Sequence, residues 1–284
     1  MGRVLETSDE QRVFDSVAGA IGSTPLVRLN RVASTAHCAV YAKLEMLNPG
    51  GSVKDRIAFG IIDAYEAAGE LEPGGTVVEA TSGNTGVGLA IACVLRGYRA
   101  IFVMPDKMSQ EKIDLLRAYG ARVVITPTAV APDDPRSYYS VARRLVEETP
   151  GAVLANQYHN PANPASHEQS TGPEIWAQTG GQVTDIVMGM GTGGTITGVA
   201  RYMRDQKAGV RIVGVDPIGS ILYDAWRRGG EEEGLEAIEY LVEGIGEDFW
   251  SRYRMRSHSP GPDGLSARKA SSRVVRQVRH SQAR

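Results

Sequence analysis

The chain has 284 residues, of which 42% are hydrophobic and 23% charged, and its formal net charge is -2. These values are typical of a soluble globular protein with enough chain for about two domains. They exclude a membrane protein, because no apolar run approaches the length of a span. The two cysteines, Cys38 and Cys93, are too few and too far apart for a disulfide framework or a CxxC metal site, so we expect no metal and a cytoplasmic location.

The charge is unevenly distributed. Residues 251–284 contain eight Arg, one Lys and one Asp, a net +8 that leaves -10 on the rest of the chain. The same segment has seven Ser and almost no apolar periodicity. It cannot bury enough surface to fold alone, so we predict a disordered basic tail.

Between residues 40 and 216 the sequence alternates between strand and helix patterns. Ile57, Ile61, Tyr65 and Ala68 share one helical face, and Gly69 supplies a stop. Strands are predicted at 40–44, 76–80, 100–104, 122–126, 153–156, 185–188 and 211–215. Helices that end near Gly69 and Gly97 are followed by helices at 109–119, 137–148, 168–178 and 195–205. Near-continuous apolar strands separated by amphipathic helices predict an α/β fold with a parallel sheet covered on both faces.

The first loop of chemical interest precedes the first of these helices. Lys54 follows the turn Asn48-Pro49-Gly50-Gly51 and stands at the head of an amphipathic run. The positive end of a helix dipole lowers the pKa of a nearby lysine, and a neutral amine is what imine chemistry requires. The alternative is an ordinary surface charge.

The second loop is Thr81-Ser82-Gly83-Asn84-Thr85-Gly86, between a strand and a helix. Hydroxyls, an amide and free helix N–H groups suit a carboxylate ligand. A capped turn would use the same residue types.

The third loop is Gly189-Met190-Gly191-Thr192-Gly193-Gly194-Thr195, which also joins a strand to a helix. Glycines allow the backbone to approach an anion, and a phosphate is the natural ligand. The same glycines fit the GxGxxG dinucleotide fingerprint, and Asp216 ends the next strand where a ribose-binding acid would stand. A nicotinamide-dependent oxidoreductase is therefore the alternative from another class, although it leaves the Lys54 and Asn84 loops unexplained.

An imine-forming lysine, a phosphate loop and a carboxylate loop together favour pyridoxal phosphate acting on an amino acid. The chain resembles the cystathionine β-synthase and cysteine synthase family over about residues 16–250. Five motifs in order carry the resemblance: Gly22 to Val27, Ser52 to Arg56, Thr81 to Gly86, Asn156 to Pro164, and Gly191 to Thr195.

The resemblance implies the two-domain tryptophan-synthase β fold (pyridoxal-phosphate fold type II). Residues 1–45 with 156–250 would form the large domain, residues 46–155 a smaller mobile domain, and residues 251–284 the tail. It further implies that Lys54 is the catalytic lysine that binds pyridoxal 5′-phosphate covalently. Asn84, Gly191, Thr192, Gly193, Gly194 and Thr195 would bind the cofactor, and Thr81, Ser82, Thr85 and Gln157 the substrate. His159 and His167 are expected to be ordinary surface or loop histidines.

The implied reaction is β-replacement on L-serine by a thiol. Stretches such as 105–112, 216–222 and 240–249 favour homocysteine as the acceptor and cystathionine as the product. The nearest alternative is a cysteine synthase that uses O-acetylserine and sulfide. The family resemblance also suggests a homodimer acting on small molecules, with no nucleic-acid or membrane partner.

The resemblance stops after Trp250, where the family continues with further strands and helices of the large domain. We therefore expect that domain to be incomplete, by C-terminal truncation or by a shifted reading frame. An unfinished domain leaves apolar faces uncovered, so an inactive remnant is a further alternative.

Overall fold

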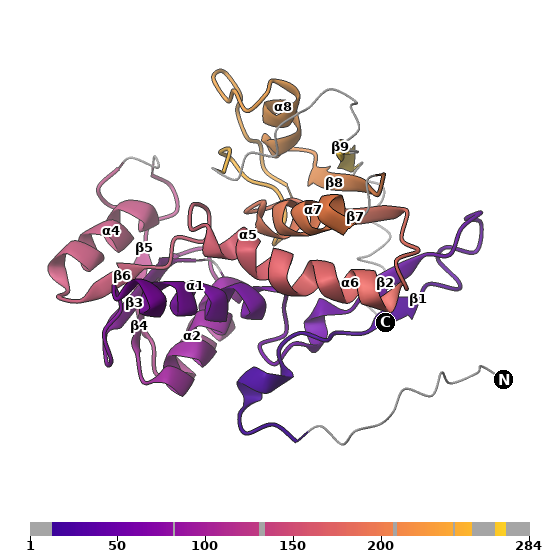
Figure 1. Cartoon of the computed structure of the whole chain (residues 1–284). Helices are drawn as coiled ribbons and strands as arrows, with labels where there is room; N and C mark the ends of the chain where they lie inside the picture. The colour runs from indigo at the N-terminus through magenta and orange to yellow at the C-terminus, as the bar shows by residue number, and fades with distance from the viewer. Residues whose placement is uncertain are drawn as a thin grey trace.

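The computed structural model describes residues 13–81, 83–130, 134–206, 209–240, 242–251 and 265–270, the last as backbone only. Figure 1 shows two groups of helices and strands, joined by the central α5–α6 segment. The short antiparallel pair β1 (Leu26–Arg28) and β2 (Tyr41–Lys43) lies in the N-terminal part. The 3-10 turns η1 (Val17–Ala20) and η2 (Glu45–Leu47) flank this pair.

The first group is built on a four-stranded parallel sheet with the order β5-β4-β3-β6. Its strands are β3 (Thr76–Ala80), β4 (Arg99–Pro105), β5 (Arg122–Thr126) and β6 (Ala152–Leu154). Its helices are α1 (Lys54–Ala68), α2 (Asn84–Arg96), α3 (Gln110–Ala118) and α4 (Tyr138–Glu148). The predicted strand and helix order is confirmed here within one or two residues at most ends.

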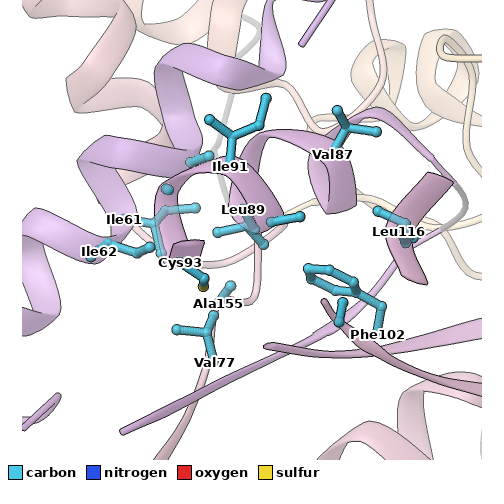
Figure 2. Close-up of a cluster of buried hydrophobic side chains, with 14 of the residues drawn as sticks. Ile61, Ile62, Val77, Val87, Leu89, Ile91, Cys93, Phe102, Leu116 and Ala155 are labelled. Atoms are coloured by element: carbon cyan, nitrogen blue, oxygen red, sulfur yellow. The ribbon is translucent and has the colours of Figure 1, made fainter. Parts of the chain in front are cut away.

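Alternation along the strands explains why both faces of this sheet are covered. Val77 and Phe102 face α1 and α2, where they join a fully buried cluster with Ile61 and Leu89 (Figure 2). Val78, next along the strand, packs with α4 on the opposite face. Removing both faces from water is what a near-continuously apolar strand requires, so the predicted two-sided parallel sheet is correct.

The second group contains β7 (Asp185–Gly189), β8 (Arg211–Pro217) and β9 (Leu265–Ala270), all parallel and in that order. Helix α7 (Gly194–Gln206) packs on Ile186 and Ile212, and α8 (Leu222–Arg227) follows β8. Val187 points to the other face and is 64% exposed. The described residues therefore leave that face largely uncovered at Val187.

The connection between the groups contains α5 (Ala162–Ser166), the π-helix η3 (His167–Thr171) and α6 (Gly172–Gln178). The sequence predicted a single helix at 168–178, and the observed helical segment begins earlier and includes a π turn. Strand β9 lies in the segment expected to be disordered, and its pairing with β8 differs from that expectation. Residues 252–264 and 271–284 lie outside the described part of the chain. The domain boundaries stay a prediction.

No helix in the described residues is both long and apolar enough to cross a membrane.

Candidate active site

Lys54 is the first residue of α1 and follows a closed turn. The Gly50 N–H donates to the Asp55 carboxylate at 2.6 Å, and the Gly51 N–H donates to the Asn48 carbonyl at 2.8 Å. Burial lowers the pKa of Lys54, and the negative charge of Glu247 partly offsets this. The direction agrees with the sequence argument. The cause differs, because loss of hydration rather than the helix dipole dominates.

The glycine loop leads into the N-terminus of α7, as the sequence predicted. Gly193 has φ 82°, a conformation that favours glycine. A Cβ on Gly194 would overlap the Asn163 side-chain oxygen, so only glycine fits against that neighbour. The free N–H groups of the first turn of α7 and the two threonine hydroxyls of the loop form a cradle suited to a phosphate ester.

Two residues show that Lys54 lies near this loop. Glu247 interacts electrostatically with Lys54, and its Oε1 lies 4.0 Å from where a Cβ of Gly191 would stand. His167 also interacts electrostatically with Lys54, and its Nε2 lies 3.1 Å from Thr195 Oγ1. Lys54 and the loop, more than 130 residues apart in sequence, therefore meet at one site. An amine with a lowered pKa beside an anion cradle fits pyridoxal 5′-phosphate.

The second predicted loop joins the same site through two contacts. A Cβ on Gly88, in the second turn of α2, would stand 3.0 Å from the Lys54 carbonyl oxygen, so α2 packs closely against the start of α1. Thr85 donates its hydroxyl proton to Gln157 Oε1 at 2.6 Å, and both side chains are buried. The structure therefore brings Thr85 and Gln157 together, as the predicted substrate set requires.

The other members of that loop are placed less uniformly. Thr81 is buried at the end of β3, and its Oγ1 accepts a hydrogen bond from the Gly83 N–H at 3.2 Å. Asn84 is exposed at the first residue of α2. Ser82 lies outside the described residues. The roles of all these residues stay predictions.

Sequence reasoning missed the buried carboxylate Glu79 in the middle of β3. It accepts hydrogen bonds from the backbone N–H groups of Asn156 at 2.7 Å and Gln157 at 3.4 Å. Asn156 has φ 52°, an uncommon conformation for a residue other than glycine. Burial raises the pKa of Glu79 to about 7, against the lowering effect of these hydrogen bonds. Glu79 thus fixes a strained turn that carries Gln157 into the site. A lone acid within an apolar strand pattern was the available signal.

His159 is exposed, as expected, but the expectation for His167 is wrong. His167 is 1% exposed on the π-helix, with Nδ1 2.9 Å from Thr171 Oγ1 and Nε2 3.1 Å from Thr195 Oγ1. π turns inside helices occur frequently at functional sites. The ring orients a hydroxyl of the glycine loop, and burial together with the charges of Lys54 and Arg56 lowers its pKa to about 3.

This lowered pKa predicts acid sensitivity. The folded state resists protonation of His167 between pH 6.5 and about 3, whereas the unfolded chain takes up the proton near pH 6.5. Stability is therefore lost as pH falls below 6.5, with a contribution from His167 of about 1 kcal/mol between pH 7 and 5.5. Urea unfolding at several pH values should show a shallower acid-side loss in His167→Gln than in the unmodified chain.

The comparison isolates His167, because Glu79 and Glu247 are present in both proteins. Burial raises the pKa of each carboxyl to about 7, and their contributions to stability fall as pH rises from 4.5 to 7, opposite to that of His167. Parallel pH curves for the two proteins would contradict the buried neutral ring.

The nicotinamide alternative depended on Asp216. Asp216 is fully buried, and its Oδ2 accepts a hydrogen bond from the Tyr223 N–H at 2.8 Å. The carboxylate therefore binds the first turn of α8 and is turned away from solvent. Asp216 therefore does not present its carboxylate to a ribose at the end of β8, as the nicotinamide alternative would require.

A lysine of lowered pKa near a glycine loop that suits a phosphate is the arrangement expected of an enzyme with a phosphate-bearing aldehyde cofactor. The family model described as "Pyridoxal-phosphate dependent enzyme" matches residues 17–269. The chain belongs to this family, whose cofactor is pyridoxal 5′-phosphate. The match extends beyond residue 250, where the sequence resemblance was expected to stop.

Comparisons with individual proteins also find relatives of this chain that are named as synthases. The chain is 46% identical over 246 residues to the cystathionine beta-synthase of Apis mellifera, covering 86% of this chain and 48% of the relative. It is 46% identical over 248 residues to cysteine synthase 1 of Neurospora crassa, covering 86% and 65% respectively. The crystal structure of O-ureido-L-serine synthase matches with a TM-score of 0.79 and 37% identity, covering 91% of this chain and 77% of that one. The chain therefore spans about half the length of the Apis mellifera protein and about two thirds of the length of the Neurospora crassa protein.

Proposed function

We propose that the protein catalyses pyridoxal-phosphate-dependent β-replacement on L-serine, with homocysteine as the acceptor and cystathionine as the product. The observation that carries this proposal is that Lys54, whose pKa is lowered, lies near the glycine loop. The same loop is joined to Gln157 by hydrogen bonds from Asn163, and Gln157 accepts a hydrogen bond from Thr85. Support for β-replacement comes from relatives named cystathionine beta-synthase and cysteine synthase.

In this proposal the cofactor supplies an electron sink for the substrate's α-carbon. The substrate carboxylate is bound, and the α-hydrogen oriented, by Thr81, Ser82, Thr85 and Gln157, while Asn84 contacts the cofactor. The neutral Lys54 amine removes that proton and later returns it. Over the whole reaction the C–O bond of the β-hydroxyl breaks and the thiol sulfur forms the new bond to the β-carbon, and the hydroxyl leaves as water with the proton that the thiol loses. Burial lowers the pKa of Lys54, which favours the neutral amine that the first transfer requires.

Lys54→Ala tests the proposal directly. The unmodified chain supplied with cofactor should turn yellow, and borohydride should then leave a pyridoxyl group on Lys54 that peptide mapping detects. The variant should lose the visible band and at least a thousandfold in turnover, because the amine that binds the cofactor and transfers the proton has been removed. Lys107→Ala, at an exposed lysine, is the matched control and should keep the band. A pyridoxyl group found elsewhere would contradict the assignment.

Cysteine synthesis from O-acetylserine and sulfide is the second candidate, because the identity to the Neurospora crassa cysteine synthase equals that to the Apis mellifera protein. Product analysis with each donor paired with each acceptor separates the two. Cystathionine from serine and homocysteine supports the first proposal, and cysteine alone supports the second. A colourless chain that binds no cofactor would identify an inactive remnant.

A further inference from the structure

Asn163, on the short helix α5, joins two of the loops described above. Its side chain is 1% exposed, and its Nδ2 donates to the Gln157 carbonyl oxygen at 2.8 Å and to Thr192 Oγ1 at 3.1 Å. A carbonyl oxygen can only accept, so the amide must present its nitrogen to Gln157. Both amide protons are then used, one for the turn that carries Gln157 and one for the glycine loop.

At the glycine loop, Asn163 determines the direction of a hydrogen bond. Thr192 Oγ1 accepts from Asn163 and also from the Gly194 N–H at 3.3 Å. A hydroxyl has two acceptor positions and one proton, so these contacts leave the proton of Thr192 free to donate. A hydroxyl arranged in this way suits an anionic phosphate oxygen.

At the other end, the Gln157 peptide is held from both sides. Its N–H donates to Glu79, its carbonyl accepts from Asn163, and its side chain accepts from Thr85. A displacement of Gln157 that accompanied binding of a carboxylate would therefore change the Asn163 contact. The buried Asn163 amide connects Gln157 to Thr192 through these two hydrogen bonds.

The side-chain oxygen Oδ1 of Asn163 is tightly confined by its neighbours. In the described residues the buried Asn163 Oδ1 has no hydrogen-bond partner, and it lies against the Gly194 backbone, where a Cβ would overlap it. A buried acceptor without a partner is unfavourable, so an unconstrained amide would not keep this position. The close packing and the two donated bonds hold the amide in place. Because the amide lies against Gly194, a movement at the start of α7 would displace it.

We propose that Asn163 is a positioning residue that couples occupancy of the substrate-carboxylate site to affinity of the glycine loop for the cofactor phosphate. The inference rests on the proposed function, and it adds a link between two sites that bind different parts of the reacting complex. Because such coupling is reciprocal, a ligand at either site should strengthen binding at the other.

The experiment uses the full chain, freed of cofactor, with pyridoxamine 5′-phosphate and L-serine as probes. Both probes are amines, so they cannot condense with each other or with Lys54. Calorimetric titration should show that saturating L-serine tightens binding of pyridoxamine 5′-phosphate about fivefold or more, within the usual range for coupled sites. In Asn163→Ala this factor should fall close to one, and the affinity measured without serine should also decrease.

Two threonine variants separate the coupling from general loss of structure. Thr192→Val keeps the side-chain shape and removes the hydroxyl, so it should abolish the factor while the Asn163 bond to Gln157 remains. Thr192→Ser keeps the hydroxyl and should retain the factor. This pair decides the question even if Asn163→Ala fails to fold. A factor caused by direct contact between the probes would survive in every variant.

The inference is overturned by an unmodified chain with a factor of one, or by an unchanged factor in Asn163→Ala or Thr192→Val. In either case, a pyridoxyl group on Lys54 after borohydride would show that the proposed function still stands. A chain that binds neither pyridoxal 5′-phosphate nor pyridoxamine 5′-phosphate would overturn the proposed function and the coupling together.

Discussion

Replacing Arg56 with methionine is expected to destabilise the fold by about 3–5 kcal/mol, a large part of the stability of an ordinary domain. The Arg56 side chain is 2% exposed and pairs with Glu45 at 2.8 Å and Glu174 at 2.7 Å. Both carboxylates are mostly buried, and Arg56 is their main cationic partner. Methionine fills the space but removes the cation that the two carboxylates share. Lys43 still pairs with Glu174 at 2.7 Å, so the cost comes chiefly from the desolvated Glu45 carboxylate and from weaker compensation at Glu174.

The same pairing predicts how this cost depends on pH. Burial alone would raise the pKa of Glu174, but hydrogen bonds from Arg56 and Lys43 outweigh burial and lower it to about 2. Glu174 therefore stabilises the fold above pH 4.5, and that contribution is lost as pH falls toward 2. In Arg56→Met, Lys43 and the Ser23 N–H still bind Glu174, but this contribution is smaller. The difference between the unfolding free energies of the unmodified chain and the variant should therefore narrow below pH 4.5.

Arg96→Met is the matched control, because Arg96 also pairs with two carboxylates, Asp63 and Glu66, but at the surface. Ion pairs in water contribute little, so the expected loss is below about 1 kcal/mol. Denaturant unfolding of the two variants gives the comparison. Equal losses would show that burial of the Arg56 network does not set its energy. Arg56 also lies two residues after Lys54, so its variant should form the lysine–cofactor conjugate less completely.

The sequence predicted the strands, most helices and the loops that carry the site, because these depend on local patterns. Gly69 and Gly97 show this well. Each ends a helix in the left-handed conformation that glycine adopts freely, and each was recognisable without knowledge of the fold. The order of loops at the carboxyl ends of parallel strands also follows from chain topology.

The polar network behind the site was not predictable in this way. Arg56 and Glu174 are 118 residues apart, and nothing local to either residue indicates that they meet. His167 was taken for an ordinary histidine because its burial depends on how α7 packs against the π-helix. Glu79 is likewise explained only once its strand lies beside the Asn156 turn. Burial and pairing of polar groups are properties of tertiary packing, which residue periodicity does not encode.

Gly198→Ala is expected to destabilise the protein by about 2–3 kcal/mol or more, through overpacking at a contact between backbones. Gly198 lies in α7, where a Cβ would overlap the Pro164 carbonyl oxygen and stand 2.7 Å from both the Glu168 nitrogen and His167 Cβ. Alanine favours helices over glycine by up to about 1 kcal/mol, so a destabilised variant means that the clash outweighs this gain. The segment that must move carries Asn163 and His167, both in contact with the glycine loop.

Gly97→Ala separates this clash from the conformational cost of replacing a glycine. A Cβ at Gly97 meets nothing within 4 Å, but the residue has φ 74°, so only the left-handed backbone is penalised, by about 1 kcal/mol. Thermal unfolding should therefore rank Gly198→Ala well below Gly97→Ala. Affinity for pyridoxal 5′-phosphate should fall in the first variant and stay unchanged in the second, because only the first displaces side chains that orient Thr192 and Thr195. Equal cofactor affinity in both would mean that the glycine loop is held independently of the helix packed behind it.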